Sequence, residues 1–456
     1  MGACEPRPSR VTPSKSGNNG ILGLLLLAIG CGEAGRPPFP MMKPPVSAST
    51  TSDTLVAATP GPSVIGPAGW GKAIAVSDAG VIHATWREGS PALYLMVYAR
   101  SVDGGATWSP AILGTCIPQA GTQATLAFAG PFPRLAAAAG HVYVSWYCAE
   151  RLATPFLVLR RSTDEGASWL APQLLQVLSF TGTGCDCDVF NFNPAVAAVG
   201  PDVHVVWSDE IQFPGLPRAY SKILLRSSHD FGATWQDIRL VSSPGPFDSW
   251  VAAIAAAADG LVHVVWVDMR NGAEMEYYRR SFDGGASFTE PEQQLTFAPN
   301  SWAPSLALSG RFVHLAYIDN RDHPTNGSFR VYYRRSADLG APGSWDEPEQ
   351  NPADAVTPTQ FPGRVSLAAS GSRVRLAWHG VGASGAGPDV YYFRSDADGE
   401  PGSWSQPIPI ATIRDHGTNP SVAMSAVDGC AHVTWEDTRS GAQQIFYRGE
   451  PSSDGP

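Results

Sequence analysis

Carboxylates, guanidinium groups and tryptophans recur along this chain at two kinds of position. One kind follows a run of alternating apolar residues, and the other stands just before the next apolar run. Arg can bind a carboxylate through two parallel hydrogen bonds, and Trp offers an apolar face to a ring-shaped polar ligand. Gathered on one concave surface, such side chains suit a sugar or another polar, partly apolar ligand. The candidate ligand-binding residues are Arg134, Asp209, Trp250, Asp268, Arg270, Trp302, Asp319, Arg321, Arg364, Asp437 and Arg439.

Three of these positions share the pattern Asp-x-Arg, at 268/270, 319/321 and 437/439. A motif that repeats with the structural unit more often knits loops together through ion pairs than performs chemistry at one place. Structural pairing and ligand contact both remain open for these residues.

The cysteines and acids offer little sign of a metal site. The stretch "CDCD" at 185–188 invites a metal interpretation, but zinc pairs are usually more widely spaced and no second Cys or His cluster has ligand spacing. A loop disulfide from this stretch to Cys116 or Cys148 is the other interpretation, and the pairing is not assigned. No metal and no cofactor are predicted. The cysteines concerned are Cys116, Cys148, Cys185, Cys187 and Cys430.

A second recurring motif is an acidic turn, first seen as "RSVDGGATW" at 100–108. The Asp carboxylate can accept hydrogen bonds from backbone N–H groups of its own tight turn, and Gly supplies the unusual backbone angles. The Trp is expected to close the hairpin by packing into its own sheet. The repeated acids are therefore interpreted as structural fasteners: Asp103, Asp164, Asp230, Asp283, Asp338 and Asp398, with Asp396 as the alternative acid in the last turn.

The elements that position these motifs are short strands. The chain contains 47 Gly, 40 Pro and 14 Trp against 31 Lys plus Arg, and it has no long helical periodicity. Alternating stretches such as "DVHVVW" each end in an aromatic residue. A small-residue strand precedes each stretch, and a third strand, the acidic turn and a fourth strand follow it. The seven aromatic positions are 86, 146, 207, 266, 317, 378 and 435.

Four strands per unit, with small residues in the first, are typical of a β-propeller blade, because the innermost strands crowd around the axis. Stacking blades in a ring buries both faces of each sheet. We predict an all-β, seven-bladed propeller over 54–456, with six blades as the alternative. Because "LVAATPGP" at 55–62 is similar to "LVSSPGP" at 240–246, residues 54–58 are predicted to supply the missing outer strand of the last blade.

The acidic turns resemble the Asp-box, or BNR, repeats of sialidase-type propellers, whose pattern is Ser/Thr-x-Asp-x-Gly-x-Ser/Thr-Trp/Phe. Six matches on a repeated frame cover residues 70 to 456. The resemblance implies turns between the third and fourth strands, on the face opposite the active site. The fifth match has two extra residues before Ser344-Trp345, and the sixth has a displaced acid. The matches begin at Ser101, Ser162, Ser228, Ser281, Ser336 and Ser395.

Sialidases hold the substrate carboxylate with three arginines and use an Asp acid/base and a Tyr activated by Glu. The resemblance makes Arg134, Arg270 and Arg321 the candidates for such a triad. The family's Arg-Ile-Pro motif is absent, and "FPRLA" at 132–136 is the nearest remnant. Glu274 and Glu276 lie near the tyrosines at 277 and 278 in one strand, which favours blade packing and surface positions for them. Enzymatic activity therefore stays open.

The N-terminus reads as a targeting segment. Three basic residues precede "ILGLLLLAIG" at 21–30, which is too short to span a bilayer and suits a signal peptide. "LLAIGC" resembles a bacterial lipobox, which would make residues 1–30 a signal peptide and Cys31 the lipidated residue. An ordinary secretory signal is the alternative. Residues 31–53 read as a Pro/Ser-rich tether. Gly32 lacks the acid typical of inner-membrane retention, which favours the outer membrane or cell surface.

Without residues 1–30 the chain has 28 basic and 40 acidic side chains, so its net charge is −12. This balance argues against nucleic acid as a partner. The sequence thus predicts an envelope-anchored, monomeric propeller that binds a glycan or protein ligand through its loops without catalysis. The alternatives are a sialidase-like glycoside hydrolase or lyase and a structural component of a surface assembly.

Overall fold

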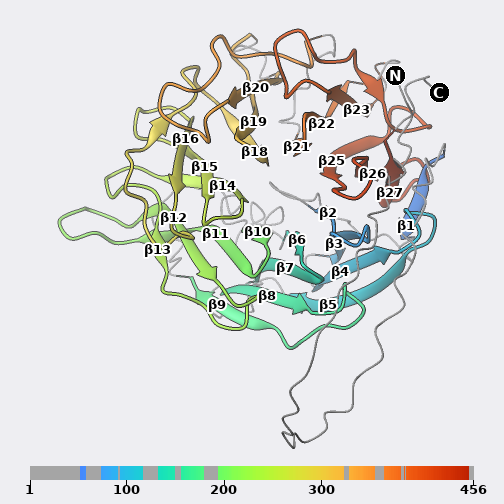
Figure 1. Ribbon diagram of the computed structural model, residues 1–456, viewed down its shortest axis with the longest axis horizontal. Coiled ribbons are helices and arrows are strands. Elements are labelled where there is room, and N and C mark those ends of the chain that lie inside the picture. The colour runs from blue at the N-terminus through green and yellow to red at the C-terminus, as the bar shows by residue number, and fades with distance from the viewer. Residues whose placement is uncertain are drawn as a thin grey trace, which may run out of the picture.

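The computed structural model describes residues 52–57, 73–90, 93–116, 132–148, 156–178, 194–322, 328–354, 364–381, 385 and 387–450. These residues form seven antiparallel sheets set around a central axis, so the predicted seven-bladed β-propeller is confirmed (Figure 1). The described residues form no helix. The predicted lipidation residue Cys31, the predicted signal peptide 1–30 and most of the predicted tether 31–53 lie outside the described residues.

Each blade runs outward from an inner strand, and the strands are numbered in chain order. Blade 1 comprises β2 (Ile74–Val76), β3 (Ile82–Ser90), β4 (Leu93–Ser101) and β5 (Ser109–Cys116). Blade 2 comprises β6 (Arg134–Ala138), β7 (His141–Cys148), β8 (Phe156–Ser162) and β9 (Gln173–Val177). Blade 3 comprises β10 (Ala195–Val199), β11 (Asp202–Ile211), β12 (Tyr220–Ser228) and β13 (Arg239–Leu240). Blades 4 and 5 comprise β14 (Ser249–Ala256), β15 (Val262–Asp268), β16 (Met275–Ser281) and β17 (Gln293–Gln294); and β18 (Trp302–Ser309), β19 (Phe312–Asp319) and β20 (Arg330–Ser336). Blades 6 and 7 comprise β21 (Val365–Ser370), β22 (Arg373–Val381), β23 (Pro388–Ser395) and β24 (Ile408–Pro409); and β25 (Gly417–Met424), β26 (Ala431–Asp437), β27 (Gln444–Gly449) and β1 (Thr54–Ala57).

The aromatic residue near the end of each second strand is buried between blades. Among the described residues there are seven hydrophobic clusters, and each contains one of these aromatics. Trp266 of blade 4, for example, lies with Val206 and Leu225 of blade 3. Burying a large aromatic at every junction contributes hydrophobic stabilisation around the whole ring. The clusters contain, in chain order, Trp86, Trp146, Trp207, Trp266, Tyr317, Trp378 and Trp435.

Four of the acidic turns share one hydrogen-bond pattern. In the first, the Ser101 hydroxyl donates to Asp103 Oδ1 at 2.7 Å and accepts the Gly105 N–H at 2.8 Å. The Thr107 N–H and hydroxyl both donate to the Asp103 carboxylate, at 2.9 and 2.6 Å. The turns around Asp164, Asp230 and Asp283 repeat this pattern. Hydrogen bonds from Thr234 lower the pKa of Asp230 to about 2, as expected for a carboxylate that accepts several donors.

In the fifth and sixth turns, the hydrogen bonds differ from those expected around Asp338 and Asp398. Ser336 bonds Ser344 at 2.5 Å and Ser395 bonds Ser403 at 2.6 Å, so a serine pair replaces the contact between Ser and Asp. Asp398 instead stands just before the turn glycine with φ of 53°, and its backbone N–H donates to Ser372 O. The assignment of Asp398 as an Asp-box fastener is therefore wrong. The two extra residues of these turns bring a second serine to the place where the acid would act.

The turns also join neighbouring blades through a repeated contact with tyrosine. Tyr278 of blade 4 donates or accepts a 2.6 Å hydrogen bond with His263, and its ring lies against the turn glycine Gly340 of blade 5. Trp345 of the same turn meets the Tyr278 ring edge to face, with centroids 5.2 Å apart. The same arrangement joins Tyr98 with Gly166 and Trp169, Tyr333 with Gly399 and Trp404, and Tyr447 with Gly105 and Trp108.

These contacts extend the expectation that the turn Trp packs into its own sheet. The indole also reaches the preceding blade: Trp345 shares one cluster with Tyr332 of its own blade and with Tyr278 of blade 4. Trp235 and Trp404 even donate their indole N–H to Gln173 and Gln350 of the preceding blades, at 3.1 and 3.0 Å. The acidic turn is thus a fastener between blades as well as within one hairpin.

The acidic turns lie at the same end of the molecule as the turns that join the first and second strands. The Glu165 N–H donates to Gly140 O, and the Leu339 N–H donates to Arg311 O. Both bonds join an acidic turn to the inner hairpin of the same blade. We call this end the box face. The ends of the second strands and the starts of the inner strands lie at the opposite end, which we call the loop face.

The ring is closed by the N-terminal strand, as predicted. β1 pairs with β27 in antiparallel register, with Thr54 opposite Tyr447 (Figure 1). Just before β1, the buried Asp53 carboxylate accepts from Arg439 at 2.6 Å and from the Thr412 hydroxyl at 2.6 Å. The start of the described chain is therefore tied to the last blade by strand pairing and by an ion pair.

Gly340→Ala is predicted to destabilise the propeller by about 2–4 kcal/mol. Gly340 has φ of 75°, which costs any residue with a Cβ, and a Cβ there would overlap the Tyr278 hydroxyl. Gly343→Ala is the matched control, since Gly343 has φ of 76° with nothing within 4 Å of a Cβ. Chemical denaturation should show a clearly larger loss for Gly340→Ala; equal losses would contradict the blade-joining role of the contact.

Asp53→Ala is predicted to cost about 3 kcal/mol, because it leaves the largely buried Arg439 without one of its carboxylate partners. Hydrogen exchange should accelerate at the backbone amides of β1. Glu292→Ala, which removes the corresponding partner of Arg270 within blade 4, is the comparison. It should lower stability without exposing β1. Unchanged exchange at Leu55 and Val56 in Asp53→Ala would show that this ion pair does not hold the closing strand.

Candidate functional site on the loop face

The three Asp-x-Arg motifs form the same clamp in three blades. Arg270 pairs with Asp268 at 2.7 Å and with Glu292, and its guanidinium lies over the Tyr277 ring at 4.1 Å. Arg321 pairs in the same way with Asp319 and Glu349 over Tyr332, and Arg439 pairs with Asp437 and Asp53 over Phe446. Each clamp links the end of a second strand to the start of the fourth-strand segment.

The clamps have the geometry of structural ion pairs. Asp268, Asp319 and Asp437 are fully buried, and each accepts hydrogen bonds from its own arginine. Burial alone would lower the pKa of Arg270, but the hydrogen bonds that it donates to Asp268 and Glu292 outweigh burial and raise that pKa. This placement agrees with the structural alternative that the sequence left open. Arg270 and Arg321 are each paired with two carboxylates in their own blades, whereas the resemblance had grouped them with Arg134 as a possible substrate-binding triad.

A different set of three arginines gathers near the axis of the loop face. Arg87 follows Trp86 on β3, Arg134 begins β6, and Arg364 stands just before β21. The guanidinium groups of Arg87 and Arg364 both lie over the Phe132 ring, at 4.4 and 5.5 Å. We call Arg87, Arg134 and Arg364 the axial arginine cluster. Arg134 and Arg364 were among the candidates predicted from the sequence. Arg87, which directly follows one of the seven aromatic positions, was expected in the same group of loops but was not named as a candidate.

The axial arginine cluster is electrostatically unfavourable. Burial and then the charge of Arg364 lower the pKa of Arg134 well below its ordinary value. Burial also lowers the pKa of Arg364 to about 10, with Glu436 opposing this shift and Arg87 adding to it. Because Arg keeps its proton in proteins, these shifts express chiefly the cost of burying the charged groups and, after that, the repulsion between them. Glu436 is the carboxylate whose charge acts on both Arg87 and Arg364.

Arg87 carries the clearest sign of unused binding capacity. Its side chain is 3% exposed, and neither Nε nor Nη1 has a hydrogen-bond partner. A buried donor left unsatisfied costs about 1–3 kcal/mol, and more for a charged group. The guanidinium is held over the Tyr94 and Phe132 rings at 4.7 and 4.4 Å, which fixes its place without using these donors. An anion beside Arg87 would satisfy them.

Residues of blades 6 and 7 border the cluster. The Asn419 side chain donates to the Glu436 carboxylate at 3.1 Å, and its backbone N–H donates to His379 Nδ1 at 3.3 Å. Burial lowers the pKa of His379 to about 4, and the charge of Arg364 lowers it further, so this ring is neutral at pH 7. A neutral His and an amide add hydrogen-bonding groups without adding positive charge.

The inner strands are strained where they enter this face. Val251, Ala303 and Asn419 have φ of 50°, 61° and 50°, in a region that β-branched and other non-glycine residues rarely adopt. The register of β14, β18 and β25 shifts at these points, as in a β-bulge. Recurrence of the same bulge in three blades makes it a feature of the repeated blade frame.

The two candidate tryptophans are not open platforms. Trp250 is buried at 8% exposure, and Trp302 is partly buried against the same hydrophobic cluster. Trp302 also bonds Glu274, whose pKa is raised by burial. Both indoles therefore support the inner strands at the loop face, and the structure shows neither of them as an exposed stacking surface.

Blade 3 carries further buried charges. Asp209 is buried, its carboxylate accepts the Glu210 N–H at 2.8 Å, and its charge acts on Tyr147. Burial, followed by the Asp209 charge, raises the pKa of Tyr147. Lys222 is fully buried and donates to Phe247 O at 2.7 Å; burial lowers the pKa of its ammonium group to about 8.

The structure does not bring the Tyr and Glu residues of β16 together as a nucleophile and its activator. Tyr277 bonds Gln294 at 3.1 Å and Tyr278 bonds His263, on opposite faces of blade 4. Burial raises the pKa of both tyrosines, which disfavours the ionised, nucleophilic form. Glu276 is fully buried, neither carboxyl oxygen has a hydrogen-bond partner, and burial raises its pKa well above the ordinary value.

Cysteine, metal and membrane features are reported for the described residues alone. Cys148 and Cys430 are both disulfide-bonded, whereas Cys185 and Cys187 lie outside the described ranges. Within those ranges, no group of three or more His, Cys, Asp and Glu side chains could hold a metal ion. The same ranges contain no helix with the length and apolar character needed to cross a membrane.

No protein-family model matches the chain, and no curated protein matches it. Solved structures similar to it include a Penicillium chrysogenum α-L-arabinanase complexed with arabinobiose, at 17% identity over 70% of this chain and 92% of that chain, with a TM-score of 0.43. A Trypanosoma rangeli sialidase mutant with trans-sialidase activity shows 13% identity over 70% of this chain and 53% of that chain, with a TM-score of 0.43. A Fusarium graminearum α-L-arabinofuranosidase with arabinobiose shows 14% identity over 70% and 92%, with a TM-score of 0.43. At these identities the similarity is one of fold alone.

Glu276→Gln is predicted to change how stability depends on pH. The folded-state pKa of Glu276 is raised, so the folded protein binds more protons than the unfolded chain above about pH 4.5. The free energy of unfolding should therefore fall as pH rises from that value toward the raised pKa. The Gln variant should lose this decline and be more stable than the parent at pH 8. Thermal unfolding from pH 4 to 9 measures the effect; parallel curves would contradict it.

Proposed function

We propose that this chain is an envelope-anchored, non-catalytic propeller that binds a carboxylate-bearing glycan through the axial arginine cluster. The observation that carries the proposal is Arg87, a buried guanidinium with two unsatisfied donors beside two further arginines. Planar guanidinium groups match carboxylates through paired hydrogen bonds. The cluster is positive although the whole chain carries a net charge of −10, so this end of the molecule attracts an anion selectively.

Binding without turnover agrees with the state of the buried tyrosines described above. Catalysis by a tyrosine nucleophile needs a lowered pKa or an adjacent base, whereas burial raises the pKa of Tyr147, Tyr277 and Tyr278. The envelope anchor in the proposal rests on the apolar segment 21–30 and Cys31 of the sequence. A sialidase-like hydrolase and a structural component of an assembly are the alternatives that the test below separates.

The test is calorimetric titration of the full-length chain with N-acetylneuraminic acid and glucuronic acid, each compared with methyl glucoside. We expect the acids to bind at least about tenfold more tightly than the neutral sugar, and less tightly at high salt. Arg87→Lys keeps the charge but loses the fork, so it should weaken acid binding by about tenfold with little change in stability. Arg218→Ala, which removes a half-exposed arginine of the loop face paired with Asp248, is the control and should bind normally.

Other outcomes would overturn parts of the proposal. Full affinity of Arg87→Lys for both acids would exclude the axial arginine cluster as the binding site. Release of fluorophore from a fluorogenic sialoside would favour the hydrolase. Binding to an acidic protein with no response to any saccharide would favour the assembly component.

A further inference from the structure

A cavity of about 410 Å³ opens on the outer wall between blades 5 and 6. It belongs to neither the loop face nor the axial arginine cluster. Its walls come from the segment after the β20 hairpin, at Gln350 to Asp354, and from the acidic turn of blade 6, at Pro401 to Pro407. Its size is within the range of small-molecule sites in proteins.

The cavity exists because blade 5 departs from the repeat. Its described sheet has three strands, and the fourth is reduced to two isolated bridges, Tyr333 with Gln350 and Ser336 with Trp345. The chain then leaves the sheet in a turn at 352–354. Within the described residues, no continuous edge strand covers the outer wall next to Trp404.

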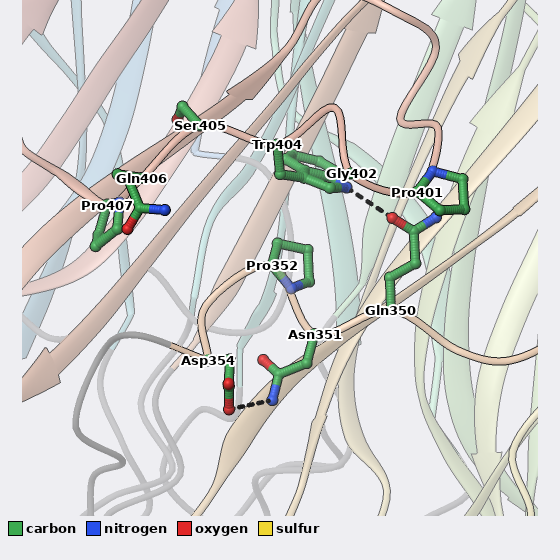
Figure 2. A pocket seen from close by; sticks show the side chains of 10 residues that line it. All are labelled: Gln350, Asn351, Pro352, Asp354, Pro401, Gly402, Trp404, Ser405, Gln406 and Pro407. Atoms are coloured by element: carbon green, nitrogen blue, oxygen red, sulfur yellow. Dashed lines mark hydrogen bonds between the residues drawn. The ribbon is translucent and has the colours of Figure 1, made fainter.

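Trp404 is held rigidly at this cavity. Its indole N–H donates to Gln350 Oε1 at 3.0 Å, and its ring meets Tyr333 edge to face at 4.9 Å. Figure 2 shows Trp404 and Pro352 on opposite sides of the cavity, with Pro401 at one end and Gln406 at the other. An aromatic ring fixed by two contacts offers an apolar surface at little cost in side-chain entropy.

Hydrogen-bonding groups surround this aromatic surface. Asn351, Asp354, Ser405 and Gln406 all line the cavity. The Asn351 amide nitrogen donates to Asp354 at 3.5 Å, while its buried Oδ1 has no hydrogen-bond partner. The Asp354 carboxylate also accepts from Arg330 at 2.9 Å, which compensates its charge. The cavity therefore presents one aromatic ring, several uncharged polar groups and one carboxylate that is paired with Arg330.

We propose that this cavity binds a neutral saccharide unit, as a second glycan site separate from the axial arginine cluster. A sugar ring has apolar C–H faces that fit against an indole, and hydroxyl groups around its edge that can pair with amides and with Asn351 Oδ1 in particular. A proline-rich peptide is the competing ligand, but such peptides dock on grooves lined mainly by aromatic residues. Here one aromatic ring is combined with four hydrogen-bonding side chains.

The experiment is ligand-observed saturation-transfer NMR on the full-length chain. The probes are the methyl glycosides of glucose, galactose and mannose, N-acetylglucosamine, and an acetyl-capped hexaproline peptide. At least one sugar should show saturation transfer. Trp404→Ala and Gln406→Ala should each lower the affinity for that sugar at least about tenfold. Gln406→Ala keeps the blade contacts of Trp404, so it keeps the proposal testable where Trp404→Ala fails to fold.

Trp235→Ala is the matched control. Trp235 occupies the same position in the turn of blade 3 and makes the same bond to a preceding-blade glutamine, but it does not line this cavity. It should lower stability and leave neutral-sugar binding intact. Arg87→Lys should also leave it intact, which separates this site from the axial arginine cluster. Absence of binding by all four sugars, loss of sugar binding in Trp235→Ala equal to that in Trp404→Ala, or binding of hexaproline alone would overturn the proposal.

Discussion

The contact between one blade's tyrosine and the next blade's turn glycine is the constraint on which this propeller depends. A single four-stranded sheet cannot bury its two faces, so each blade is stable only against its neighbours. At four junctions a glycine with positive φ lets a tyrosine ring approach the turn backbone, and the turn Trp covers the ring edge. The serine and aspartate hydrogen bonds hold the turn in the shape that makes this approach possible.

The same constraint explains why the buried histidines stay neutral. His83, His263, His314 and His432 each bond the hydroxyl of the junction tyrosine at 2.6 to 2.7 Å. Burial lowers the pKa of His263 and His314 to about 3, far below the ordinary value. A neutral imidazole can fix the tyrosine hydroxyl without placing a charge between the blades. One short polar chain, from His to Tyr to the neighbouring turn, thus couples the blades at these four junctions.

The sequence predicted the parts that repeat and missed those that depend on long-range partners. Seven aromatic positions and the likeness of 54–58 to an outer strand were enough for the blade count and for ring closure. The Trp of each turn was assigned to its own sheet, because nothing local to "GGATW" reveals the tyrosine of the preceding blade. The third members of the clamps, Glu292, Glu349 and Asp53, were also missed. They stand 22 to 386 residues from their arginines, and only the fold brings them together.

The arginines of the loop face also fall into two groups, those that repeat with the blades and those that do not. Arg270, Arg321 and Arg439 recur with the blades, and each is matched by two carboxylates, so their charge is compensated where they stand. Arg87, Arg134 and Arg364 have no common motif, and the charge of Glu436 acts on two of them. A fold gains nothing in stability by crowding buried positive charges, since each adds a desolvation cost. Repetition therefore identifies the arginines that build the ring, whereas Arg87, whose Nε and Nη1 have no hydrogen-bond partner, does not belong to a repeated clamp.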